Sequence, residues 1–163
     1  MNEVFNSHRI AFRFVQGEVV PLSSDELHVE VVEPTLRLLH GRKDLDKAHD
    51  AYLKALKEIS NEDAPDAITD AGTALQETLT ALGCQGNQLG DLLKDAKKQG
   101  LLGAHDQKLI TGIENFGAWA SAERSQSGDS HKSSEAPLAD AWLMVHVVGA
   151  LIVRLADPSR LRG

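Results

Sequence analysis

Residues 141–156 read AWLMVHVVGALIVRLA and are the most apolar stretch of the chain. His146 and Arg154 are its only ionisable side chains. A helix that is apolar on nearly every side must be buried by neighbouring helices or by a partner subunit. We therefore expect a buried helix that takes Pro137 in its first turn and ends before Asp157-Pro158.

The chain before this helix also has a helical pattern, starting at the capping-box sequence Ser23-Ser-Asp-Glu26. A first helix should run from there to about Leu39, with a kink or break at Pro34. Apolar residues then recur with helical spacing in four further segments. The expected spans are 44–60, 63–82, from a cap at Asn87 to Gly100, and 106–123.

Residues 9–22 (RIAFRFVQGEVVPL) have a different pattern, in which apolar residues alternate and Gln16-Gly17 supplies a turn. This is typical of a β-hairpin. A lone hairpin is only marginally stable, so it must pack on the helices or on another partner. The expected fold is an all-α bundle of five or six helices (23–163) preceded by a hairpin segment (1–22), which we interpret as a remnant of an upstream domain.

Composition restricts the function and the compartment. The chain has 163 residues, a net charge of -7 and one cysteine, Cys84. An acidic protein does not attract nucleic acid through its overall field, so a polyanionic partner would need a local basic patch. The single cysteine excludes an intramolecular disulfide, and we expect its thiol to be packed or merely exposed. The N-terminus lacks the pattern of a secretory signal, and the apolar run 142–153 is shorter than the roughly twenty residues of a membrane span. These features predict a soluble cytoplasmic protein.

The octet Arg124-Ser-Gln-Ser-Gly-Asp-Ser-His131 carries the residues best suited to chemistry. It lies between two expected helices, with a guanidinium that can hold a phosphate and an imidazole that can move protons near neutral pH. The pattern suggests metal-independent chemistry on a phosphodiester. The alternative is that Arg124 is a helix C-terminal cation and His131 a solvated loop residue.

Four stretches resemble the abortive-infection C-terminal family, within the HEPN superfamily of helical ribonucleases. They are AITDAGTALQETLTALG (67–83), GNQLGDLLKDAKKQGLL (86–102), ERSQSGDSH (123–131) and AWLMVHVVGALIVRLA (141–156). HEPN domains carry an Arg, usually followed by a polar residue, and a His a few positions beyond. The matching residues are Arg124 and His131, with Ser125 where the family more often has Asn, Asp or His.

This resemblance implies a metal-independent endoribonuclease that uses no cofactor and dimerises through its motif-bearing helices. His131 would be the general acid or base, and Arg124 would bind the phosphate. Ser125 and Asp129 would support them, although Asp129 is equally well explained as a turn residue after Gly128. The alternative function is a HEPN-like dimerisation or regulatory module that has lost activity.

Lysines at helical spacing could contact RNA phosphates beyond the scissile one, namely Lys94, Lys97 and Lys98, with Lys132 in the motif loop. The alternative is an ordinary solvated face, because aspartates share the same segment. Either function fits a toxin–antitoxin or phage-defence system, with an antitoxin or an N-terminal regulatory domain as a further partner. The histidines show no metal-ligand spacing, so no metal site is expected. His146 is expected to be a hydrogen-bonded core or interface residue.

Overall fold

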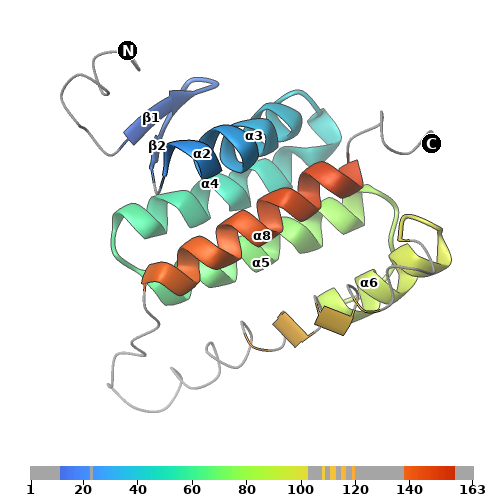
Figure 1. Cartoon of the computed structure of the whole chain (residues 1–163). Helices are drawn as coiled ribbons and strands as arrows, with labels where there is room; N and C mark the ends of the chain where they lie inside the picture. The colour runs from blue at the N-terminus through green and yellow to red at the C-terminus, as the bar shows by residue number, and fades with distance from the viewer. Residues whose placement is uncertain are drawn as a thin grey trace.

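A computed structural model describes residues 12–22, 24–102 and 138–156, together with positions 108, 111, 112, 115, 116 and 119. Within these residues the chain is helical apart from one two-stranded antiparallel hairpin (Figure 1). The expected all-α class with an N-terminal hairpin is therefore confirmed.

Helices α3 (Glu33–His40), α4 (Asp46–Ser60), α5 (Ala64–Ala81) and α8 (Leu138–Ala156) form the bundle. Helix α4 packs against α5, while α8 lies along α5 and also contacts α3 and α4 (Figure 1). A shorter helix, α6 (Leu89–Lys98), packs on α5. The largest fully buried side chains come from all these helices, among them Leu36, Tyr52, Ile68, Leu75, Leu93, Met144 and Ile152.

The hairpin pairs β1 (Phe12–Val15) with β2 (Glu18–Pro21). The two turn residues, Gln16 and Gly17, have φ angles of 50° and 95°. Positive φ at both central positions is typical of the type I′ turn, whose twist matches that of the strands. The turn expected at Gln16-Gly17 is confirmed.

The two faces of the hairpin differ in exposure. Val15 and Val20 are buried, and β2 contacts α4, so the hairpin packs on the bundle as expected. On the other face Phe12 is 36% and Val19 55% exposed. The alternation in the sequence predicts that the faces differ, but not that the phenylalanine face points outward.

The first helix begins one residue later than the predicted capping box. Ser24 is the N-cap of α2 (Asp25–Leu27), and its hydroxyl accepts a hydrogen bond of 3.1 Å from the Leu27 amide. The capping box built on Ser23 and Glu26 is therefore wrong, because the third helical position after Ser24 is a leucine that cannot bond back to the cap.

A π-helical turn (His28–Val32) joins α2 directly to α3. Pro34 has no N–H, and its ring would clash with the carbonyl four residues earlier, so a regular ladder cannot pass through it. The wider turn lets the Glu33 amide donate to the carbonyl of His28, and the Thr35 hydroxyl donates to the Val31 carbonyl at 2.7 Å. The break that was one of the two alternatives expected at Pro34 is therefore wrong, because the chain stays helical; the irregularity is the π-helical turn that precedes the proline.

The ends of α5 follow the prediction, and the start of α6 does not. The Asp66 amide donates to the Asp63 carboxylate at 3.1 Å, and Gly83 has a φ of 91° after the helix. Helix α6 is preceded by Gln88, whose side chain makes no cap bond, so the cap predicted at Asn87 is wrong. The helix expected at 106–123 lies mostly outside the described residues.

Helix α8 is long and apolar enough to cross a membrane by length and composition, the one such helix in the described part of the chain, so the expectation that its apolar run is too short for a span is wrong on length. Its inner side is packed against the bundle, which is how a core helix of a soluble protein meets the same criterion. Cys84 is buried as a free thiol, which confirms that it is packed.

Candidate functional site

The predicted catalytic octet falls outside the described residues. Arg124, Ser125, Asp129 and His131 lie there, and so does Lys132. What the structure does describe is the helix that follows, since α8 begins at Leu138. The site can therefore be built only from its scaffold.

Helix α8 is held at several points along its length. The Tyr52 hydroxyl of α4 donates to the Val145 carbonyl at 3.2 Å. One turn further, Gly149 allows a close approach, because a Cβ at this position would lie 2.5 Å from the Tyr52 hydroxyl and 2.9 Å from the Thr35 hydroxyl. At the end of the helix Arg42 Nη1 donates to the Ala156 carbonyl at 2.9 Å. A segment that precedes α8 is thus attached to a firmly packed element.

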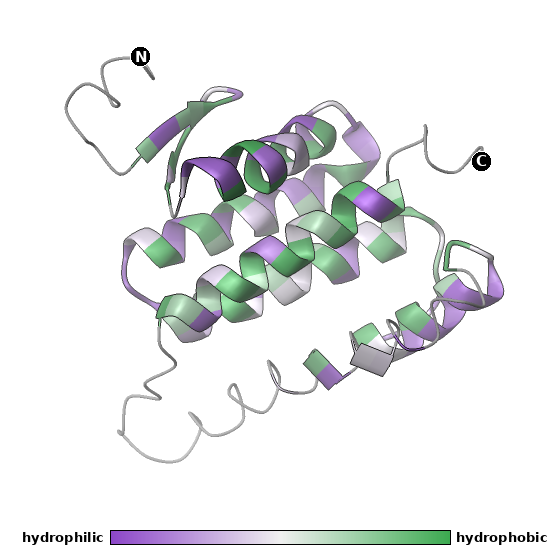
Figure 2. Cartoon of the chain, viewed as in Figure 1, coloured by the Kyte–Doolittle hydropathy of each residue, from purple (hydrophilic) through white to green (hydrophobic). Residues whose placement is uncertain are grey.

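The opposite side of α8 is an apolar stripe that the bundle leaves uncovered. We call it the α8 stripe and define it by Ala139, Leu143, Val147 and Ala150, which follow one another at helical spacing. Leu143 is 51% exposed, Ala139 and Ala150 are exposed, and Val147 is half-buried. Figure 2 shows green, apolar segments along α8 in this view. Burial of this helix by neighbouring helices is therefore found on its inner side, and burial of the other side by a partner subunit stays a prediction.

His146 lies beside the α8 stripe. Its ring stacks on that of Trp142, with centroids 5.4 Å apart. The side chain is half-buried, and burial lowers the pKa of His146 below its usual range. A half-buried histidine next to an apolar stripe agrees with the core-or-interface role expected for it.

The predicted RNA-binding lysines of α6 do share an exposed face. Lys94, Lys97 and Lys98 are exposed, while Leu92, Leu93 and Ala96 of the same helix are buried. Aspartates dilute this basic face, as expected from the sequence.

Two aspartates, Asp91 and Asp95, reduce the positive charge of this face. Asp91 lies 3.8 Å from Lys94 Nζ. Asp95 accepts hydrogen bonds from the Gln85 amide at 2.8 Å and from Gln99 Nε2 at 2.7 Å, and these bonds lower its pKa. Asp95 is therefore kept ionised beside Lys98.

A groove between β2 and α4 offers no basic site either. Its two lysines are Lys54 and Lys57, and Lys54 Nζ lies 3.1 Å from Asp70 Oδ1 of α5. The same ion pair raises the pKa of Lys54, to which Asp66 and Glu58 add. Acidic groups therefore surround this lysine. The groove is lined by Glu18, Val19, Val20, Leu53, Lys54, Leu56, Lys57 and Ser60.

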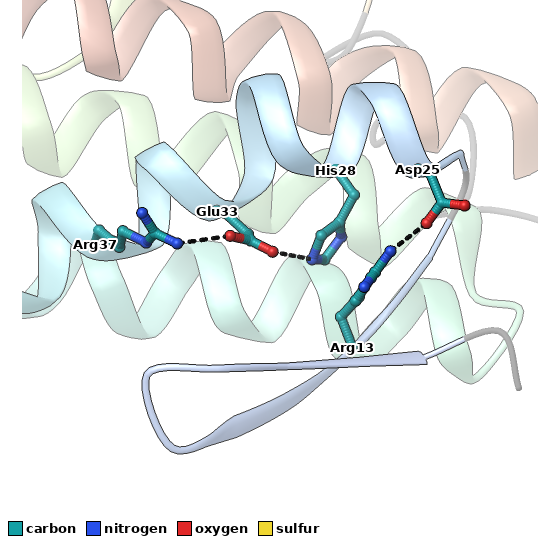
Figure 3. A network of polar contacts seen from close by, with 5 residues as sticks. All are labelled: Arg13, Asp25, His28, Glu33 and Arg37. Atoms are coloured by element: carbon teal, nitrogen blue, oxygen red, sulfur yellow. Dashed lines mark hydrogen bonds and ion pairs between the residues drawn. The ribbon is translucent and has the colours of Figure 1, made fainter. Parts of the chain in front are cut away.

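A polar cluster that the sequence did not predict lies where the hairpin meets the first helix (Figure 3). His28 is buried to 1% exposure, and its Nε2 lies 3.8 Å from Glu33 Oε1, too far for a hydrogen bond. Glu33 instead accepts a bond of 2.8 Å from Arg37. The side chain of Arg13, from β1, lies beside His28 and pairs with Asp25 of α2.

The electrostatics of this cluster disfavour a charged His28. Burial has the largest effect and lowers the pKa of His28; Glu33 and Asp25 raise this pKa, whereas Arg13 and His146 lower it. Among the residues that the structure describes, neither ring nitrogen of His28 has a hydrogen-bond partner. The signal that could have identified the cluster is Arg13, which alternates with Phe12 and Phe14 in β1 and shares a face with the buried Val15 and Val20.

A metal site needs several ligand side chains close together. In the part of the chain that the structure describes, no three His, Cys, Asp or Glu side chains gather closely enough to hold an ion. No family model, curated protein or solved structure matches this chain.

Proposed function

We propose that this chain is a HEPN-type, metal-independent endoribonuclease that acts in the cytoplasm as a toxin or abortive-infection effector. One observation supports the proposal: His131 precedes the start of α8 at Leu138 by only seven positions, and α8 is held by Tyr52, Gly149 and Arg42. Catalysis needs groups at fixed positions, and a loop attached to such a helix can provide them.

The chemistry follows from the two side chains. An RNA 2′-hydroxyl attacks the adjacent phosphorus, the bond to the 5′-oxygen breaks, and a 2′,3′-cyclic phosphate and a 5′-hydroxyl result. His131 accepts the 2′-hydroxyl proton or donates one to the leaving oxygen, a role worth about 10²–10⁴-fold in rate. Arg124 binds the phosphate and stabilises the charge that builds on its oxygens, worth about 3 kcal/mol.

We further propose that the active form is a homodimer built on the α8 stripe. Leu143 and Val147 are large apolar residues on a helix that is otherwise part of the core. Covering them with the same stripe of a second copy removes apolar surface from water and places both octets beside one interface. His146 and Trp142 would lie at the edge of this contact.

RNA beyond the scissile phosphate would meet Lys132 and the α6 lysines. Each phosphate contact releases condensed counterions, so RNA binding should weaken steeply as salt rises. The aspartates on α6 favour the second candidate, an inactive HEPN-like dimerisation or regulatory module. Ser125 and the net charge of -7 support that candidate as well.

A cleavage assay separates the two candidates. Purified protein is incubated with RNA in EDTA beside Arg124→Ala, His131→Ala and, as a matched control, His40→Ala, which removes an exposed histidine of α3. The enzyme predicts cleavage by the wild type and the control, loss in both motif variants, and products with 2′,3′-cyclic phosphate ends. Equal cleavage by all four proteins, or none, favours the inactive module.

The dimer has its own test. Leu143→Glu places a charge in the α8 stripe, while Val29→Glu changes a residue of similar exposure, 48%, in the π-helical turn. We expect the wild type and Val29→Glu to have the mass of a dimer in solution and Leu143→Glu that of a monomer. A wild-type monomer at micromolar concentration would contradict the dimer.

A further inference from the structure

We propose that Arg13 and His28 form an acid-sensitive latch that holds the β1–β2 hairpin on the helical bundle. This inference is independent of the ribonuclease proposal, because it involves neither the octet nor the α8 stripe. It concerns the cluster in Figure 3, where β1, α2, the π-helical turn and α3 meet.

The hairpin is attached to the bundle by few contacts. Val20 of β2 is buried and β2 contacts α4, while β1 contributes the buried Val15, a contact with α3 and the ion pair of Arg13 with Asp25. Its outer face leaves Phe12 and Val19 exposed. A two-stranded element with so little buried surface is the part of a fold that opens before the core does.

His28 is the buried side chain beside the Arg13–Asp25 ion pair. Its side chain is 1% exposed, and the charged and titratable groups that face it come from every element around it: Arg13 of β1, Asp25 of α2, Glu33 of α3 and His146 of α8. The cations and the carboxylates are already paired, Arg13 with Asp25 and Arg37 with Glu33. A neutral imidazole therefore fits the closed cluster, and a proton adds an unbalanced positive charge beside Arg13.

Opening the hairpin changes this balance. Once Arg13 leaves, His28 meets water and regains the ordinary histidine pKa of about 6.5. The open state then binds a proton that the closed state resists, so acid favours opening. At pH 5.5 the opening constant can rise at most about tenfold over its value at pH 7.5, the limit for one histidine that titrates only when open.

Hydrogen exchange of the full chain, followed by mass spectrometry between pH 5.5 and 7.5, tests the latch. After correction for intrinsic rates, amides of residues 12–21 should exchange up to about tenfold faster at pH 5.5, while those of α5 stay unchanged. His28→Gln keeps a polar side chain that cannot titrate and should abolish the pH dependence. His146→Gln should retain most of it, since His146 has the smallest effect on the pKa of His28 among the groups that face it.

Arg13→Gln provides the second variant, which decides the question if His28→Gln does not fold. It should speed exchange of the hairpin already at pH 7.5 and reduce its dependence on pH. Wild-type hairpin exchange that is independent of pH would overturn the latch, and so would an equal pH dependence in wild type and either the His28 or the Arg13 variant.

Discussion

Gly149→Ala is the substitution whose effect the packing of α8 predicts most sharply. The new methyl group would lie 2.5 Å from the Tyr52 hydroxyl and 2.9 Å from the Thr35 hydroxyl, both inside the core. Overpacking of this kind costs about 1–3 kcal/mol. If Tyr52 moves away, it also loses its bond to the Val145 carbonyl, worth about 1 kcal/mol.

One favourable effect opposes these costs. Alanine is better than glycine in a helix interior by about 1 kcal/mol. The net expectation is that the free energy of unfolding falls by about 2 kcal/mol, taking the middle of the overpacking range. For a chain of this length that corresponds to a melting temperature lower by about 4–8 °C.

Gly72→Ala is the matched control. Gly72 lies in α5, and a Cβ there would meet only the Met144 methyl, at an ordinary 3.6 Å. This variant should keep the gain in helix propensity, so its free energy of unfolding should be about 1 kcal/mol higher than that of the wild type. The two glycine variants should therefore shift the urea midpoint in opposite directions.

The double variant Gly149→Ala/Tyr52→Phe separates the contact from a general effect of the methyl group. Removing the hydroxyl relieves the closest approach, so the pair should cost less than the sum of the single changes. A Gly149→Ala protein at least as stable as the wild type would refute the close approach of α4 and α8.

Three further predictions concern caps, the cysteine and pH. Ser24→Ala and Asp63→Ala should each lower the free energy of unfolding by about 1 kcal/mol in urea titrations, because each removes the oxygen that accepts a hydrogen bond from a first-turn amide. A variant as stable as the wild type would contradict the cap at that position. Cys84 should react with a thiol reagent only on unfolding, because it is buried and its pKa is raised by burial and by Asp95; rapid labelling of the native protein would contradict this. Burial lowers the folded-state pKa of His28 and His146, so their contribution to stability is complete above about pH 6.5 and is lost as the pH falls below it. Unfolding in urea from pH 5 to 8 should show this decline, and a flat profile would contradict it.

The fold was predictable where a local signal and a burial pattern agree. The Gln16-Gly17 turn, the start of α5 near Asp63 and the buried face of α4 each depend on a few neighbouring residues, and each is confirmed. The cap errors are of one residue, at Ser24 and Gln88, because adjacent polar residues give equivalent signals. The form of the turn before Pro34 depends on how the chain regains its hydrogen bonds, which spacing alone does not specify.

The candidate site was less predictable from the sequence. The octet is identified by its side chains and by resemblance, and its geometry lies outside the described residues. His28 was missed because its neighbours Arg13 and His146 are distant in sequence and meet it only in the folded chain. The α8 stripe was missed for a related reason, since an all-apolar helix does not reveal which side its neighbours leave uncovered.

The packing of α8 also has a consequence for the order in which the protein is made. Its contacts join residues far apart in the chain: Tyr52 bonds to Val145, 93 positions away, and Arg42 bonds to Ala156, 114 positions away. Such distant contacts form late and slow folding. During synthesis the surfaces of α3, α4 and α5 that α8 covers therefore stay exposed until α8 has left the ribosome. The core between α3, α4 and α5 can close only after α8 has been made.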